Sequence, residues 1–151
     1  MHTEVIVTNN NDVHIVETHL RMGGDKIPEL IELASGFDLL HTWCKQIVDG
    51  SINWDNIPEI TADNTKHFAA IRFFVADKGI VGHQIKEVCT DWIQLHPDIC
   101  ECSVYLKKGD MIPENTDSFS RLGHIILCND SYNVVNDLSD KLVCNRVVIA
   151  I

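Results

Sequence analysis

Two short segments rich in β-branched residues open the chain, and a cluster of turn-forming residues separates them. The first covers residues 3–8 and the second covers residues 13–18, with three asparagines and an aspartate between them. β-Branched side chains favour extended backbone, whereas asparagine and aspartate favour tight turns. The chain is therefore expected to begin with an antiparallel hairpin. On such a hairpin Glu4 and Glu17 can share one side of the sheet.

The second segment runs into a polar motif that ends in two glycines. It reads Glu17-Thr18-His19-Leu20-Arg21-Met22-Gly23-Gly24. Alternation along a strand places Glu17, His19 and Arg21 on one face. A hard cation such as Mg²⁺ prefers oxygen ligands, usually one or two carboxylates together with phosphate oxygens. An adjacent arginine can hold a phosphate or carboxylate through two hydrogen bonds, and glycines let backbone N–H groups approach an anion.

Two interpretations of this motif follow from the spacing. In the first, Glu4 and Glu17 bind a metal ion beside Arg21. In the second, the same charges form an exposed strand face and pair with one another, which is the commoner arrangement of charged residues. Spacing alone leaves both interpretations open.

The remainder of the chain combines helical and extended patterns. The first helix is expected to begin at Asp25 as N-cap, with Pro28 in its first turn, and to stop at Gly36. The other expected elements are a helix at 38–48, a loop at 51–66, strands at 69–75, 99–106, 123–128 and 146–151, helix-compatible spacing at 84–95, and a helix at 130–143.

This order of elements indicates an α+β fold in three parts. Residues 1–50 form a hairpin-and-helix unit, residues 51–66 form a linker, and residues 67–151 form a mixed sheet with flanking helices. The order of the strands does not follow from the sequence.

Composition excludes several classes of function. The formal net charge is −10, and the 12 basic residues are scattered, with Lys107-Lys108 the only adjacent pair. Nucleic-acid binding requires clustered Lys and Arg, so it is not expected. There is no apolar run of membrane-spanning length and no leader after Met1, so a cytoplasmic location without membrane contact is the default. None of the six cysteines forms a C-x-x-C pair, which favours buried, reduced thiols over zinc.

Nearly the whole chain resembles the carboxy-terminal part of an ATP-grasp carboxylate–amine ligase, of the amino-acid, dipeptide and carnosine-synthase-like group. In that family a strand ending in Glu is followed by a hairpin, a Glu-x-Asn-x-Arg motif, glycines, Ile-Pro and a helix ending in Ala-Thr-Gly. Here Glu4 precedes the motif at residues 17–24, and Ile27-Pro28 and Ala34-Ser35-Gly36 follow. Later similarities lie at residues 67–74, 107–110 and 116–124.

The resemblance implies roles for the residues of the hairpin. Glu4 and Glu17 would be ligands of Mg²⁺. His19 stands where the family has a metal-binding Asn, and its nitrogen is better suited to Mn²⁺ or Zn²⁺ than to Mg²⁺. Arg21 would stabilise charge on the transferred phosphoryl group or acyl phosphate, as the catalytic residue.

The resemblance also implies where the substrate would bind. The turn at Gly23-Gly24 would hold the carboxylate substrate. Considered as single residues, Arg72 and Arg121 either line the active site as substrate-binding residues or pair with carboxylates at the edge of the core, and both interpretations stay open.

Ligases of this kind use ATP to convert a carboxylate into an acyl phosphate, which an amine then attacks. The complete enzyme also needs lysines that clamp the nucleotide, and no glycine-rich phosphate loop with a following Lys occurs in this sequence. The chain is therefore expected to work with a missing amino-terminal ATP-grasp portion, as a dissected domain, a split-gene subunit or a remnant. The alternative is a non-catalytic module that forms a homodimer or docks a partner through an open sheet edge.

Overall fold

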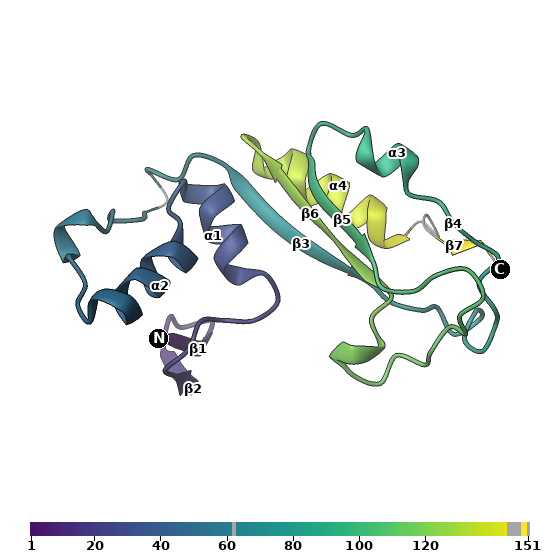
Figure 1. Ribbon diagram of the computed structural model, residues 1–151, viewed down its shortest axis with the longest axis horizontal. Coiled ribbons are helices and arrows are strands. Elements are labelled where there is room, and N and C mark those ends of the chain that lie inside the picture. The colour runs from purple at the N-terminus through teal and green to yellow at the C-terminus, as the bar shows by residue number, and fades with distance from the viewer. Residues whose placement is uncertain (62, 145–148, 151) are drawn as a thin grey trace.

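The computed structural model describes residues 1–61, 63–144 and 149–150. A hairpin and two helices lie at one end of the molecule, and a three-stranded sheet backed by a long helix lies at the other (Figure 1). The elements in chain order are β1 (His2–Val7), β2 (Val13–His19), α1 (Ile27–Ser35), α2 (Leu39–Asp49), a 3₁₀ turn (Trp54–Asn56), β3 (Phe68–Phe74), β4 (Glu87–Val88), α3 (Asp91–Gln94), β5 (Ile99–Val104), a second 3₁₀ turn (Ser118–Ser120), β6 (Gly123–Asn129), α4 (Tyr132–Cys144) and β7 (Ile149–Ala150).

The predicted amino-terminal hairpin is confirmed. Strands β1 and β2 are antiparallel, and the backbone positions of Glu4 and Glu17 are direct partners. A register shift follows Glu4, because Val5 pairs with Ile15 and leaves Val16 without a partner in β1. The two strands form a sheet of their own among the described residues. Apart from two partly buried histidines at its open end, every side chain in the hairpin strands is exposed.

Local signals set most ends of the first two helices. Gly36 and Gly50 end α1 and α2 with φ of 76° and 69°, a left-handed conformation that glycine adopts without strain. Asp38 begins α2 by accepting a hydrogen bond from the backbone N–H of His41 at 2.7 Å. The predicted N-cap of α1 is wrong. Lys26 occupies that position, and the side chain of Asp25 instead contacts Arg121.

The segment after α2 returns the chain to α1 before the second sheet begins. The backbone N–H groups of Lys66 and His67 both donate to the carbonyl oxygen of Ala34, at 2.8 Å and 3.1 Å. This return places β3 beside α1, and α1 packs against both β3 and β6. The hairpin-and-helix part is thereby joined to one face of the sheet.

The second sheet has the strand order β3-β6-β5 and is antiparallel throughout, whereas a mixed sheet was predicted. Helix α4 follows β6 and packs on β3 and β6 without linking two parallel neighbours, so no parallel pair arises. The side chains of β6 alternate between the two faces of the sheet. Ile125 and Leu127 lie in a buried core with Val135 and Leu142 of α4.

The predicted helical segment at residues 84–95 is mostly not helical. It contains the short strand β4, which pairs with β7, and a single turn of helix, α3. Ile85 lies in a loop, and its side chain is buried in a second apolar core with Ile80, Ile112 and Leu122. Apolar spacing over a short segment does not distinguish a buried loop from one face of a helix. Of the predicted last strand, residues 149–150 are extended, and residues 146–148 and 151 lie outside the described part.

No helix in the described ranges has the length and apolar character needed to cross a membrane.

Candidate functional site

The hairpin brings together the two predicted metal-binding carboxylates. Glu4 and Glu17 lie opposite each other on neighbouring strands, and the Nε2 atom of His19 lies 2.9 Å from Oε1 of Glu17. The hydrogen bond from His19 and the charge of that ring lower the pKa of Glu17. The Glu17 carboxylate is therefore ionised at neutral pH, which is the form that binds a cation.

Arg21 lies just beyond β2 and belongs to the same group. Its Nη1 atom donates to the carbonyl oxygen of Met22 at 3.0 Å, and its charge contributes to lowering the pKa of Glu17. Of the predicted residues, the structure thus brings Glu4, Glu17, His19 and Arg21 to one region of the hairpin.

The two glycines that follow have different surroundings. A methyl group added to Gly23 would lie 2.7 Å from Cδ1 of Ile27 and 3.2 Å from the ring of His2, whereas one added to Gly24 would meet nothing within 4 Å. A side chain at position 23 would therefore crowd Ile27 and His2, where the turn packs on α1 and β1. Gly24 leaves its backbone open to a ligand.

The donor set of the hairpin fits part of a divalent-cation site. Within the described residues, no group of three or more His, Cys, Asp or Glu side chains is placed to hold a metal ion. Two carboxylates are the number that Mg²⁺ commonly takes from a protein when phosphate oxygens and water complete its coordination. The hairpin residues fit that incomplete role, with His19 already hydrogen-bonded to Glu17.

Arg121 approaches the glycine turn from the segment that precedes β6. Its Nη1 and Nη2 atoms lie 2.7 Å and 3.3 Å from the two carboxylate oxygens of Asp25. Its guanidinium carbon lies 3.7 Å above the centre of the Phe73 ring. Lys26 follows Asp25 in the turn, and its Nζ atom lies 3.3 Å from Oε1 of Glu101. These contacts fix the end of the glycine turn against the sheet.

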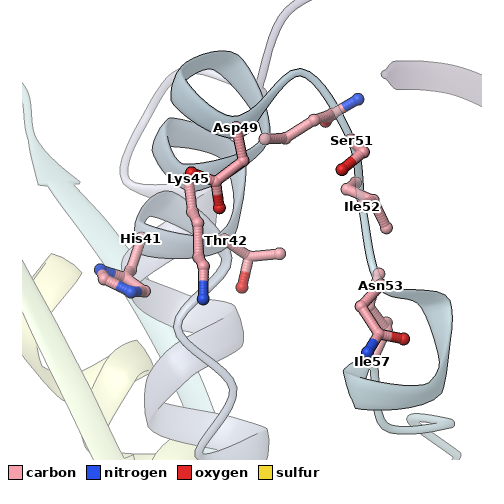
Figure 2. Close-up of a pocket in the computed structure, with 9 residues that line it drawn as sticks. His41, Thr42, Lys45, Asp49, Ser51, Ile52, Asn53 and Ile57 are labelled. Atoms are coloured by element: carbon pink, nitrogen blue, oxygen red, sulfur yellow. The ribbon is translucent and has the colours of Figure 1, made fainter.

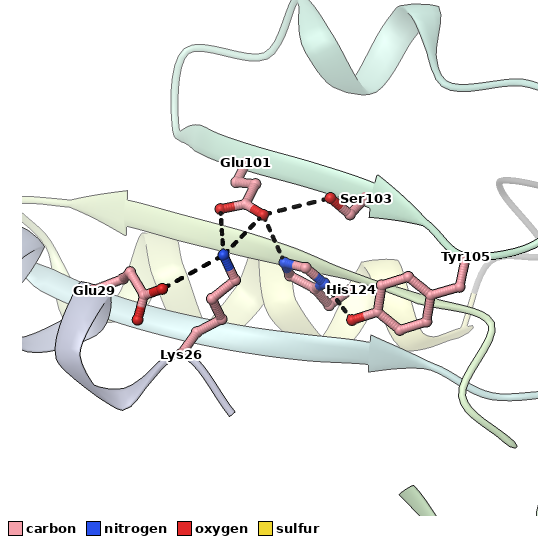
Figure 3. A network of polar contacts seen from close by, with 6 residues as sticks. All are labelled: Lys26, Glu29, Glu101, Ser103, Tyr105 and His124. Atoms are coloured by element: carbon pink, nitrogen blue, oxygen red, sulfur yellow. Dashed lines mark hydrogen bonds and ion pairs between the residues drawn. The ribbon is translucent and has the colours of Figure 1, made fainter. Parts of the chain in front are cut away.

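A polar network that the sequence did not reveal continues from Lys26 across the same face of the sheet (Figure 3). His124 is buried, with Nε2 2.9 Å from Oε1 of Glu101 and Nδ1 2.6 Å from the hydroxyl of Tyr105. Burial raises the pKa of Glu101, but the hydrogen bonds from His124 and Lys26, together with the charges of these two residues, lower it by more. The residues come from β5, β6 and the segments beside them, so no local motif could have identified the group.

Arg72 lies apart from this group. It comes from β3, where it pairs with Ile125 of β6, and its Nη2 atom lies 3.9 Å from Asp140 of α4. The structure therefore places Arg72 on the α4 face of the sheet and Arg121 on the α1 face.

Three concave surfaces adjoin the first helices. A cavity of about 370 Å³ lies between the end of α2 and residues 51–57, with Lys45, Asp49 and Asn53 among its polar lining (Figure 2). A mostly apolar cavity of about 260 Å³ lies beside Gly23 and includes Trp43. A groove of about 680 Å³ between α1 and the sheet is lined in part by Glu101.

Five cysteines are free thiols, and they are less buried than predicted. Cys44, Cys89 and Cys100 are exposed, and Cys102 and Cys128 are partly buried.

Comparison with solved structures identifies the fold. An L-amino acid ligase from Bacillus licheniformis superposes with a TM-score of 0.80 over 99% of this chain at 12% identity. A phosphoribosylglycinamide synthetase from Anaerococcus prevotii superposes with a TM-score of 0.70 over 99% of this chain at 20% identity. The fold is that of the carboxy-terminal part of an ATP-grasp ligase.

The chain spans about a third of each matched chain, 35% of the first and 36% of the second. The sequence matches no protein-family model and no curated protein. At identities of 12% and 20%, the agreement with these two structures establishes the shared fold, and the chemistry has to be argued from the residues.

Proposed function

We propose that this chain is the carboxy-terminal portion of an ATP-dependent carboxylate–amine ligase that joins amino-acid-like substrates. The observation that carries the proposal is the opposed pair Glu4 and Glu17, placed next to Arg21 and a glycine turn within an ATP-grasp fold. In such a ligase the γ-phosphate of ATP is transferred to a carboxylate, and an amine displaces phosphate from the acyl phosphate. Negative charge accumulates in both steps, so positioned cations dominate catalysis.

Each residue of the hairpin site then has a distinct role. Glu4 and Glu17 would hold Mg²⁺ or Mn²⁺ against the phosphates of ATP. His19 would orient the Glu17 carboxylate through their hydrogen bond, and with Mn²⁺ its ring nitrogen is also a suitable ligand. Arg21 would stabilise the transferred phosphoryl group, and the open backbone of Gly24 would approach the carboxylate substrate together with Gly23.

The proposed site needs further groups to hold the nucleotide. The hairpin supplies carboxylates and one arginine. The lysines that clamp the nucleotide phosphates in ATP-grasp ligases have no counterpart identified in this sequence. We infer that activity requires an amino-terminal ATP-grasp portion, either in the same polypeptide or as a separate subunit. For the 151-residue chain alone we expect Mg²⁺–ATP binding no tighter than about millimolar by calorimetry, a weak-contact scale. Micromolar binding would contradict this inference.

The test of the ligase itself traps its intermediate. The chain is combined with an ATP-grasp amino-terminal portion and incubated with Mg²⁺, ATP, a panel of amino acids and hydroxylamine. Hydroxylamine converts an acyl phosphate into a hydroxamate, so hydroxamate that depends on both ATP and the metal supports the proposal. Phosphate release without hydroxamate from any amino acid would argue for a different reaction.

A second candidate function rests on the exposed apolar side chains of the hairpin. Val7, Val13 and Ile15 are 59%, 62% and 70% exposed, although β1 and β2 pair only with each other among the described residues. A small sheet with open edges and apolar faces favours association with another chain. Light scattering over a range of concentrations tests this alternative, because a module for homodimerisation must show a mass above that of the monomer, and a strict monomer would contradict it.

A further inference from the structure

Arg121 binds the carboxylate of Asp25 in the geometry with which proteins recognise carboxylate ligands. Two guanidinium nitrogens face two carboxylate oxygens, at 2.7 Å and 3.3 Å. Paired contacts of this kind add geometric specificity to charge attraction. The Arg121 side chain is 22% exposed and that of Asp25 is 57% exposed, so the carboxylate is on the solvent side. A ligand can therefore reach Arg121 by taking the place of Asp25.

The arginine is held in place independently of Asp25. Its guanidinium group lies over the ring of Phe73, 3.7 Å from the centroid. The next residue, Leu122, is buried and donates its backbone N–H to the carbonyl oxygen of Phe74 at 2.8 Å. These contacts would remain if Asp25 moved away, so the binding geometry is preorganised.

Asp25, in contrast, occupies a strained turn. Asp25 and Lys26 have φ angles of 51° and 64°, two consecutive non-glycine residues in the left-handed region. Aspartate tolerates that conformation, but a lysine rarely adopts it. The contacts that Lys26 makes with Glu101 and Glu29, at 3.3 Å and 3.5 Å, help to hold the turn against the sheet. Strain of this kind persists only where surrounding contacts impose it.

We propose that Arg121 is a recognition site for a small carboxylate and that Asp25 occupies it in the absence of ligand. Within the proposed function, on which this assignment rests, the ligand is the α-carboxylate of the amine substrate. That carboxylate does not react, so it suits a fixed guanidinium group. Asp25 directly follows Gly24, so a ligand at Arg121 lies beside the turn assigned to the reacting carboxylate.

The first experiment measures carboxylate binding to the 151-residue chain without ATP. Glycine is titrated while amide chemical shifts are followed by NMR, and glycinamide, which lacks the carboxylate, serves as the control ligand. Asp25→Asn removes the internal competitor and should tighten glycine binding about tenfold or more, the factor expected when a competent state is populated at a tenth or less. Arg121→Gln should abolish binding in both backgrounds.

Control variants separate the proposal from its alternatives. Asp63→Asn removes one negative charge from an exposed turn elsewhere, so it measures the effect of net charge alone. Asp25→Gly removes the carboxylate and relieves the left-handed strain, which keeps the test valid if Asp25→Asn folds poorly. Equal tightening by Asp63→Asn, no tightening by either Asp25 variant, or unchanged binding in Arg121→Gln would overturn the proposal.

The two proposals fail in different ways. The titration uses neither nucleotide nor an amino-terminal portion, so it reports on Arg121 alone. If no hydroxamate forms in the ligase assay but glycine binds Arg121 in competition with Asp25, the carboxylate site is retained and the ligase is rejected. If hydroxamate forms but no carboxylate binds at Arg121, the ligase is retained and the carboxylate site is rejected.

Discussion

Nε2 of His124 lies 2.9 Å from Oε1 of Glu101, and Nδ1 of the same ring lies 2.6 Å from the hydroxyl of Tyr105. Both nitrogens of a side chain that is only 4% exposed are thus satisfied by residues of β5 and its continuation. The imidazole is a central polar contact of the α1 face of the sheet. Its replacement would leave Glu101 with one fewer donor in a partly buried position.

From this contact we predict that His124→Ala destabilises the fold by about 2–4 kcal/mol, because it removes a buried ring and breaks a hydrogen-bonded network. Chemical denaturation of the chain measures the change. His83→Ala, at an exposed histidine, is the matched control and should change the free energy of unfolding by less than about 0.5 kcal/mol. A His124 effect no larger than the control would mean that the network contributes nothing to stability.

The lowered pKa of Glu101 predicts a specific dependence of stability on pH. Because the pKa in the folded chain lies below the ordinary value of 4.5, ionised Glu101 stabilises the fold above pH 4.5. That contribution is lost as the pH falls through the lowered pKa. Glu101→Gln should therefore flatten the fall in melting temperature below pH 4.5. Parallel curves for the variant and the unmodified chain would show that Glu101 is not coupled to folding.

Glu17 is predicted to matter for turnover and little for folding. If the proposed ligase is reconstituted with an amino-terminal portion, Glu17→Gln keeps the shape of the side chain but removes the ionised oxygen that would face the metal. Loss of one such electrostatic contribution typically lowers turnover by about a hundredfold or more. The melting temperature should change by less than about 2 °C, as for an exposed substitution in a chain of this size.

Glu114→Gln, at an exposed loop position, is the control for Glu17→Gln and should leave turnover unchanged. If the Glu17 variant keeps full turnover, Glu17 has no part in the mechanism. If it loses much of its stability, Glu17 has a structural role, and the metal site at the hairpin is rejected.

The glycine turn offers a paired test of packing. An added methyl group at Gly23 would crowd Ile27 and His2, whereas the same group at Gly24 meets no atom within 4 Å. We predict that Gly23→Ala destabilises the chain by about 1–2 kcal/mol through overpacking. Gly24→Ala should change stability by less than about 0.5 kcal/mol. Thermal denaturation of the two variants side by side compares them, and equal stability would show that the turn adapts without cost.

Local patterns were sufficient to predict the elements of the first part of the chain. Alternating β-branched residues and an Asn-rich turn predicted the hairpin, and its register places Glu4 opposite Glu17. Gly36 and Gly50 marked the ends of α1 and α2. Such signals act over a few residues, because strand alternation and helix capping depend on neighbours in the sequence. The ATP-grasp fold itself was recognised from the order of these motifs.

Short segments and long-range pairs depended on the tertiary structure. Residues 84–95 follow a mostly non-helical path because the loop buries Ile85 in an apolar core, and apolar spacing alone does not report which surface covers a side chain. Asp25 is not the N-cap of α1 because Arg121, 96 positions away, binds its carboxylate. The sequence by itself determined where the hairpin, the first two helices and α4 form. Packing of α1 on the second sheet decided which charges meet, because such contacts depend on distances between elements far apart in the chain.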